Sequence, residues 1–294
     1  MTDDQRSKLL ARYRVVDGGG FQLSDHDPND TAGMSRDAGQ AMLLEGVARL
    51  AELQDRLYAN ASWALLVVLQ AMDAAGKDGT IKRVLTGVNP QGVSIVSFKA
   101  PSTEERAHDF LWRHSAALPR RGFIALHNRS HYEEVLVVRV HPEMLDGQRL
   151  PPLARDQKNF WRHRLSDIAQ WEQYLARQGT VQLKIFLNVS RDEQRKRLLT
   201  RLDDPNKTWK FEASDLAERE RWGDYMTAYE SAISATAAPH APWYVVPADH
   251  KWFSHLVTVQ AMVAALEALD LTWPVPTTPK SVIDEARLKL AKVG

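Results

Sequence analysis

The stretch ALLVVLQAMDAAGKDGT, residues 64–80, joins an unbroken apolar run to a loop that contains glycine and lysine. Residues 64–69 are short enough for a strand buried on both faces, which is typical of parallel sheets covered by helices. The loop that follows resembles a phosphate-binding loop, whose backbone N–H groups and lysine hold phosphate oxygens at the start of a helix. Gly76 and Lys77 stand where this motif needs them. The stretch therefore predicts an α/β core with a phosphate site.

Two positions of this loop depart from the usual pattern. Ala71 replaces the first glycine, and Asp78 replaces the hydroxyl residue that follows the lysine. That hydroxyl normally helps to hold Mg²⁺, so metal binding is expected to fall to a carboxylate. Asp73 is the first choice for this role, and Asp78 and Thr80 are weaker ones. The alternative is a turn whose lysine happens to follow a strand.

The rest of the chain alternates between strand and helix patterns. Residues 36–60 place apolar side chains at helical spacing and predict one amphipathic helix. Ser102 with Glu105, and Ser190 with Glu193, have the spacing of capping boxes at helix starts. Further strands are predicted at residues 93–98, 123–126, 181–189 and 243–246. Alternating strands and helices predict a doubly wound α/β sheet.

Between residues 135 and 179 the pattern changes, because several prolines interrupt it. Residues 156–178 then predict a long polar helix with many basic and aromatic side chains. An insertion of this kind between two core strands is where kinases keep mobile lids. Residues 1–35 include Gly18, Gly19 and Gly20 and show little periodicity, so they predict a loop-rich leader.

Composition excludes several classes of protein. The 294 residues include 38 basic and 37 acidic side chains, so no overall charge draws the chain to nucleic acid or to a membrane. There is no cysteine, which excludes disulfides, thiolate catalysis and cysteine-based zinc sites. The N-terminus lacks a signal-peptide pattern, and no apolar run approaches the length that spans a bilayer. These features predict a soluble, cytoplasmic protein with neither nucleic acid nor membrane as a partner.

A second group of polar residues, HNRSHYEE at 127–134, follows the predicted strand 123–126. Ligands of open α/β sheets lie at the carboxyl ends of the strands. Arg129 is therefore expected to face the same crevice as Lys77 and to chelate phosphate oxygens. The alternative is a salt-bridged loop. The histidines of this region lack metal-ligand spacing and are interpreted as core or polar residues.

Two long stretches resemble the family-2 polyphosphate kinases. The first is LQAMDAAGKDGTIKRVLTGVNPQGVSIVSFKAPSTEERAHDFLWR (69–113), continued by HNRSHYEEVLVVRVHP (127–142). The second is FLNVSRDEQRKRLLTRLDDPNKTWKF (186–211), continued by a predicted helix at residues 215–229 and by APWYVVPADHKWF (241–253). The resemblance implies a three-layer P-loop kinase fold, similar to thymidylate kinase, with a central parallel sheet and a helical lid.

This resemblance also implies a division of the chain and a reaction. Residues 36–270 would form the kinase domain, with a lid insertion at about 140–178, and residues 271–294 a C-terminal tail. The enzyme would move the terminal phosphate of inorganic polyphosphate reversibly to ADP and to AMP, and to the guanine nucleotides GDP and GMP, with Mg²⁺ or Mn²⁺. Members of the family tend to form homodimers or homotetramers.

The family's site residues carry over position by position. Asp73 matches the catalytic loop aspartate and metal ligand, Lys77 the phosphate-binding lysine, and Arg129 the arginine of the second motif. Asn128 and Glu133 fall where acceptors are selected, and this version resembles the branch that accepts nucleoside mono- and diphosphates. Ala71, where that branch commonly has glycine, is a departure. The polyphosphate is expected to contact residues Ala74, Ala75, Gly76, Lys77, Asp78, Gly79, Thr80, Lys82, Arg83, Arg129, Arg195, Lys196, Arg197, Arg201, Lys207 and Lys210.

Two other functions share parts of this pattern. An ATP-dependent nucleoside monophosphate kinase has the same loop and lid, so only its phosphate donor separates it from a polyphosphate kinase. A P-loop switch that binds nucleotides without transferring phosphate is the second alternative.

Overall fold

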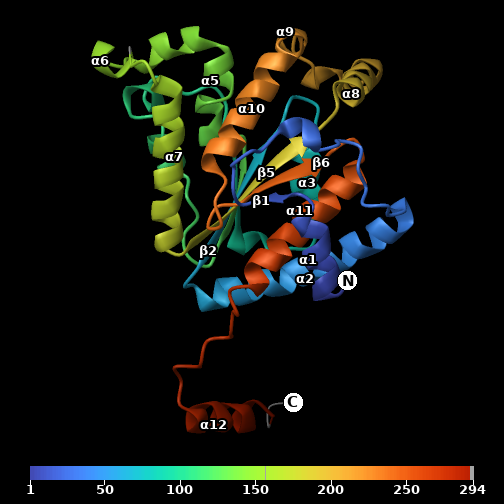
Figure 1. The fold of residues 1–294 in the computed structure, drawn as a ribbon. Coiled ribbons are helices and arrows are strands. Elements are labelled where there is room, and N and C mark those ends of the chain that lie inside the picture. The colour runs from blue at the N-terminus through green and yellow to red at the C-terminus, as the bar shows by residue number, and fades with distance from the viewer. Residues whose placement is uncertain (156, 292–294) are drawn as a thin grey trace.

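The computed structural model describes residues 1–155 and 157–291. Its centre is a six-stranded sheet with the strand order β1-β6-β5-β2-β4-β3 (Figure 1). The strands are β1 (Arg14–Val15), β2 (Ala64–Gln70), β3 (Val93–Ser97), β4 (Ile124–Asn128), β5 (Thr180–Asn188) and β6 (Trp243–Pro247). All pairings among β2 to β6 are parallel, and β1 pairs antiparallel with β6.

Every residue of β2 is buried, as expected for a strand covered on both faces. Its neighbours are β5 and β4, and Leu69 of β2 is paired with Asn128 at the end of β4. The five strands predicted from the sequence are confirmed, with ends that differ by one or two residues. Because β2 and β4 end side by side, the segments that follow them meet at one edge of the sheet.

Helices cover both faces of this sheet. Strand β5 contacts α7 on one face and α11 on the other, and α11 packs along α2 (Figure 1). The described helices are α1 (Asp3–Ala11), α2 (Arg36–Asn60), α3 (Lys77–Val84), α4 (Trp112–Ala116), α5 (Val137–Val140), α6 (Pro152–Arg155), α7 (Phe160–Arg177), α8 (Arg191–Asp203), α9 (Ser214–Glu220), α10 (Trp222–Thr236), α11 (Lys251–Glu267) and α12 (Lys280–Ala291). The predicted α/β fold is therefore confirmed, and α2 has the predicted bounds.

The two predicted capping boxes differ in the structure. Ser102 and Glu105 exchange both bonds, each side chain accepting from the backbone N–H of the other residue. At the start of α8, the Ser190 hydroxyl accepts from the backbone N–H of Glu193, but Asp249 receives the N–H of Ser190. The carboxylate of Glu193 is thereby free to pair with Arg197, 2.9 Å away.

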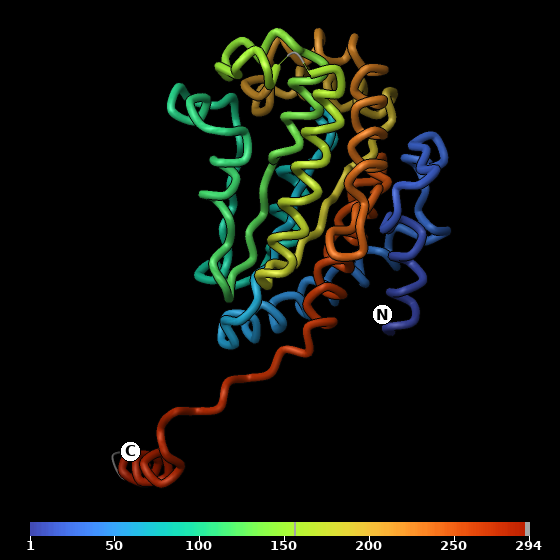
Figure 2. Tube along the Cα trace, turned by 60° about the vertical axis from the view of Figure 1, so that its left-hand side comes forward, coloured from blue at the N-terminus to red at the C-terminus, as the bar shows by residue number. Residues whose placement is uncertain are grey.

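The leader contains regular structure that its glycines did not predict. Helix α1 is capped by a full capping box between Thr2 and Gln5, and β1 extends the sheet. Leu9 and Leu10 are buried against the core. The prediction of a loop-rich leader is wrong for residues 3–11, because this packing supplies what the weak local pattern lacks. At the other end, residues 272–279 run outward to α12, which stands apart from the body (Figure 2).

Helix α7 lies in the second half of the predicted lid insertion, residues 140–178. It begins at Phe160, four residues later than expected, and residue 156 lies outside the described residues. Its inner side chains, including Ile168 and Glu172, are buried against the core. Helix α7 is thus anchored to the sheet, and closure of residues 140–178 over the site stays a prediction. Over the described ranges, no helix is both long and apolar enough to cross a bilayer.

Buried histidines predict a loss of stability in acid. Burial lowers the pKa of His127 and of His255 to about 4, and also lowers the pKa of His114. An unfolded histidine titrates near pH 6.5, so the unfolded chain binds more protons below that pH. Stability is therefore fully present above about pH 6.5 and falls toward pH 4, by on the order of 1–2 kcal/mol per buried histidine.

Urea unfolding between pH 7.5 and pH 4.5 measures this slope. Replacing His127 by asparagine is expected to flatten the slope, while His240→Asn, at an exposed position, leaves it unchanged. Equal slopes in all three proteins would contradict the assignment to the buried rings.

Candidate active site

The loop after β2 is held in the shape of a phosphate cradle. Ala74 and Gly76 both have a positive φ, of 61° and 116°, and Gly76 precedes the first turn of α3. Lys77 bends back so that its Nζ donates to the carbonyl oxygen of Ala71 at 2.8 Å. Burial and the charge of Arg129 lower the pKa of Lys77. The lysine is therefore preset at the mouth of the loop, as the sequence predicts.

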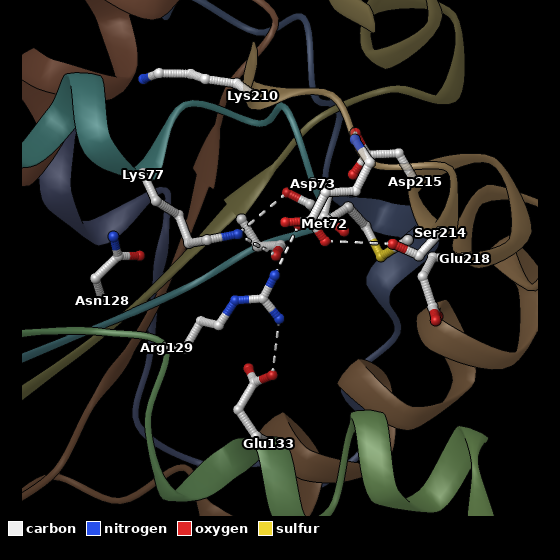
Figure 3. A network of polar contacts seen from close by, with 12 residues as sticks. Met72, Asp73, Lys77, Asn128, Arg129, Glu133, Lys210, Ser214, Asp215 and Glu218 are labelled. Carbon is white, nitrogen blue, oxygen red and sulfur yellow. Dashed lines mark hydrogen bonds and ion pairs between the residues drawn. The ribbon is translucent and has the colours of Figure 1, made fainter. Parts of the chain in front are cut away.

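Arg129 lies beside this loop, because β4 ends next to β2. Its Nη2 donates to Asp73 Oδ1 at 2.8 Å, and its Nη1 donates to Glu133 Oε2 at 3.0 Å (Figure 3). The charge of Glu133 raises the pKa of Arg129, which stays cationic. Three predicted site residues thus form one chain, Asp73–Arg129–Glu133, next to Lys77.

Asp78 and Asn128 form a separate contact at the start of α3. Asn128 Nδ2 donates to Asp78 Oδ1 at 2.8 Å, and Lys210 Nζ lies 3.8 Å from Asp78 Oδ2. Asp78 is therefore joined to the end of β4 and to the segment after α8. This contact places Lys210 near the loop, and its binding of polyphosphate stays a prediction.

Asp215, at the start of α9, is a site residue that the sequence reasoning missed. Asp215 lies near Asp73 (Figure 3). Burial and the charge of Asp73 raise the pKa of Asp215. Arg201 Nη1 donates to Asp215 Oδ2 at 3.1 Å, so this predicted polyphosphate contact is tied to α9. An aspartate in the first turn of a helix is common, and no local pattern distinguished this one.

The Asp73 and Asp215 carboxylates fit a hard divalent cation. Mg²⁺ is usually held by one or two carboxylates together with substrate phosphates, rather than by a closed cage of protein ligands. Residues 1–155 and 157–291 contain no group of three or more acidic or histidine side chains that would form such a cage. Two carboxylates beside a phosphate loop therefore suit Mg²⁺ or Mn²⁺ that arrives with substrate.

Lys82, Arg83 and Lys207 are further basic residues that the sequence predicts to contact polyphosphate. Lys82 is exposed on α3, and Lys207 pairs with Asp204 at 2.6 Å. Arg83 lies near His255 of α11. Burial lowers the pKa of His255, and the charge of Arg83 lowers it further. In the described part of the chain, no hydrogen bond or ion pair joins Lys82 or Arg83 to the Asp73–Arg129 pair. Thr80 is 1% exposed and points into the protein.

Arg197 has a different place from the one expected of a polyphosphate contact. It is buried, and its Nη1 donates to the Ala75 carbonyl oxygen at 2.6 Å. Its Nη2 donates to the Ala248 carbonyl oxygen at 2.6 Å, beyond β6. Beside it, Gln194 donates to the Asp73 carbonyl oxygen at 3.0 Å. Helix α8 therefore fastens the phosphate loop to the sheet edge, which its basic sequence did not reveal.

Replacing Arg197 by methionine is expected to destabilise the protein by about 3 kcal/mol, because buried carbonyl oxygens lose their donors. The phosphate loop would loosen, so KM for polyphosphate should rise as well. Thermal unfolding and steady-state kinetics measure both effects. Arg191→Met, at an exposed position of the same helix, is the matched control. Equal stability of the two variants would show that the contacts of Arg197 are not the anchor.

Comparisons with known proteins agree with this geometry. A family model described as Polyphosphate kinase 2 matches residues 33–272. An ADP-polyphosphate phosphotransferase of Rhodopseudomonas palustris is 49% identical over 245 residues, covering 83% of this chain and 84% of the relative. An AMP/ADP-polyphosphate phosphotransferase of Meiothermus ruber is 44% identical over 278 residues, covering 93% and 99%.

Solved structures give the same result. The crystal structure of a polyphosphate kinase 2 from Arthrobacter aurescens superposes with a TM-score of 0.87 at 40% identity, covering 97% of this chain and 96% of the other. The family match spans strands β2 to β6, the phosphate loop and the Asp73–Arg129–Glu133 chain. This chain therefore belongs to the polyphosphate kinase 2 family.

Proposed function

We propose that the protein transfers the terminal phosphate of inorganic polyphosphate to ADP and to AMP, reversibly and with Mg²⁺ or Mn²⁺. The observation that carries the proposal is the contact of Arg129 with both Asp73 and Glu133 beside Lys77. The names of the Rhodopseudomonas and Meiothermus relatives support the two acceptors.

In the transfer, a terminal phosphate oxygen of the acceptor attacks the last phosphorus of polyphosphate. A new P–O bond forms as the bridging P–O bond breaks, and the shortened polyphosphate leaves with the bridging oxygen. Lys77 and Arg129 neutralise charge on the oxygens of the moving group. Asp73 with Asp215 would hold the metal ion, which supplies further charge neutralisation. Burial of Lys77 and Asp215 strengthens these interactions.

Basic residues after α8 suit the remaining polyphosphate. Lys210 reaches the loop through Asp78, and Lys207 carries a second cation on the same segment. The charge of Lys207 also contributes to lowering the pKa of Lys251, so these two ammonium groups lie near each other. A chain of phosphates would neutralise this cluster of like charges. These residues line the proposed path of the polyanion away from Lys77.

The choice of acceptor is proposed to depend on Glu133, with Asn128 at the opposite end of the same segment. Glu133 accepts a hydrogen bond from Nη1 of Arg129, while Asp73 accepts one from Nη2. Glu133→Gln is expected to lower kcat/KM for AMP about tenfold more than for ADP, since the shorter acceptor depends more on this alignment. Parallel kinetics with the two acceptors measure the ratio. A ratio equal to that of the unchanged protein would remove Glu133 from acceptor selection.

The test of the acceptors is a set of reactions with purified protein, Mg²⁺ and polyphosphate. ADP, AMP, GDP and GMP are offered one at a time, and products are separated by chromatography. ATP formed from ADP and ADP formed from AMP are the expected results, with guanine nucleotides accepted as well. Tight ADP binding without any product would instead favour the nucleotide-binding switch.

A homodimer or homotetramer is proposed for the assembled enzyme. Helix α12 stands apart from the body and exposes Val282, Leu288 and Leu290, which a second copy would cover. Light scattering after size-exclusion chromatography is expected to give two or four times the chain mass. A monomer at working concentration would exclude this assembly.

A further inference from the structure

The backbone of Arg129 is held in a conformation that arginine rarely adopts. Its φ is 64°, in the left-handed region where side chains other than glycine are disfavoured. Such a conformation persists only where surrounding contacts impose it. Locally, the Arg129 N–H donates to the Leu69 carbonyl oxygen at 3.0 Å, and Gln70 Nε2 donates to Ser130 Oγ at 2.9 Å. These contacts fix the entry to the turn, and its exit needs other partners.

The exit is the 3₁₀ helix η4 (His131–Glu134), whose inner side chains meet a buried carboxylate. Glu172 of α7 is 1% exposed and is surrounded by three donors. Tyr132 donates from its hydroxyl at 2.8 Å, and Lys184 of β5 donates from Nζ at 2.6 Å. The third, His131 Nε2, lies 3.3 Å from the same carboxylate.

The network continues beyond Glu172 to a third element. Lys184 Nζ also donates to the carbonyl oxygen of Thr236 at 2.7 Å, and Tyr132 Oη lies 2.8 Å from Thr236 Oγ1. Burial raises the pKa of Glu172, but the charge of Lys184 and the hydrogen bond with His131 outweigh it, and the pKa is lowered overall. Helices α7 and α10 and strand β5 are therefore joined at one ionised group beneath η4.

The buried ion pair of this network adds little net stability to the packing of the three elements. Removing a buried ion pair from water costs about as much as its attraction returns, and apolar replacement is often neutral. What the pair provides over apolar packing is direction, because each hydrogen bond fixes the angle of its partner. Here the directed partners are His131 and Tyr132, which stand between Arg129 and Glu133.

We propose that the buried Lys184–Glu172 pair positions Arg129 and Glu133 for phosphate transfer by holding the middle of η4. The proposal rests on the phosphotransfer assigned above. Within the described residues, neither Lys184 nor Glu172 forms a hydrogen bond or ion pair with Asp73, Lys77 or Arg129, so both act through the turn. A second buried pair, Arg164 with Glu134 at 3.0 Å, ties the last residue of η4 to the same helix. Helix α7 thus contacts η4 at two points, through Glu172 and through Arg164.

The first test replaces both members of the pair, as Lys184→Met with Glu172→Leu. The double variant is expected to fold, with kcat for ADP and polyphosphate reduced about 10- to 100-fold by displacement of Arg129. KM for polyphosphate is expected to change less than twofold, because Lys77 and the phosphate loop are untouched. A folded double variant with unchanged kcat would overturn the proposal. Tyr132→Phe removes only the hydroxyl that contacts Glu172, Thr236 and Lys184, and it decides the question if the double variant does not fold.

The second test asks whether the effect passes through Arg129. Each change is combined with Arg129→Lys, which keeps the cation but loses the two-sided geometry. A positioning role predicts that the losses do not multiply, whereas independent sites give multiplied losses. Val246→Ala, a buried change in β6, is the control, and its loss of kcat should multiply with that of Arg129→Lys. If the losses of kcat for Tyr132→Phe and Arg129→Lys multiply, the proposal is contradicted. If the protein without substitutions has no polyphosphate-dependent activity, the proposed function is contradicted instead.

Discussion

Asp73→Asn is expected to lower kcat about 10³-fold while the protein keeps its fold. The change preserves size but removes the charge that pairs with Arg129 at 2.8 Å and that faces Asp215. Without this carboxylate, the metal ion loses a ligand and Arg129 loses one of its two anchors. Loss of one preorganised electrostatic group at a reacting centre commonly costs 10²–10³-fold in kcat, and loss of a metal ligand adds to that cost.

Circular dichroism and thermal unfolding check the fold, and initial rates with ADP and polyphosphate check the activity. Asp192→Asn, at an exposed position of α8, is the matched control and should retain full activity. Raising Mg²⁺ or Mn²⁺ should restore part of the rate if metal binding is the main loss. Near-normal kcat at ordinary Mg²⁺ would remove Asp73 from the mechanism.

Lys77→Met is expected to lower kcat/KM by about 10³-fold, because the phosphate loop loses the ammonium group that it holds beside the Ala71 carbonyl oxygen. The lysine also predicts a pH dependence. Burial and Arg129 lower its pKa below the ordinary 10.5, so the ammonium loses its proton at a lower pH than an exposed lysine does. Activity that needs the ammonium is present below that pKa and is lost as pH rises through it.

The profile of kcat/KM against pH tests this sign. Lys77→Arg keeps the charge at every accessible pH, so its residual activity should lack the alkaline decline. Lys8→Met, exposed on α1, is the control and should leave the profile unchanged. An alkaline decline that persists in Lys77→Arg would assign it to another group.

Much of the fold followed from the sequence because its signals were local. The apolar run 64–69 is too short for a helix and too apolar for an exposed strand, so β2 could be predicted from it alone. Helix α2 was equally clear from its periodicity. Helix α1 was missed because its burial depends on distant residues of α11 and not on its own pattern.

Among the site residues too, those with a local sequence signal were predicted and the others were missed. Asp73, Lys77 and Arg129 follow strand ends, so the parallel sheet brings them together wherever the pattern is recognised. Asp215 and Arg197 lie on helices that reach the loop only after folding, and each looks like an ordinary surface residue in the sequence. The buried Glu172–Lys184 pair joins residues of a polar helix and a strand, and no spacing rule links them.

Competition between phosphate donors tests the central claim most directly. Purified protein with Mg²⁺ is given AMP and either polyphosphate or ATP, and then both together with only one of them labelled in the terminal phosphate. The account predicts label in ADP from polyphosphate and little from ATP, and a much slower transfer of label from polyphosphate in Asp73→Asn. Label that comes only from ATP would contradict the account and would identify a nucleoside monophosphate kinase on the same fold.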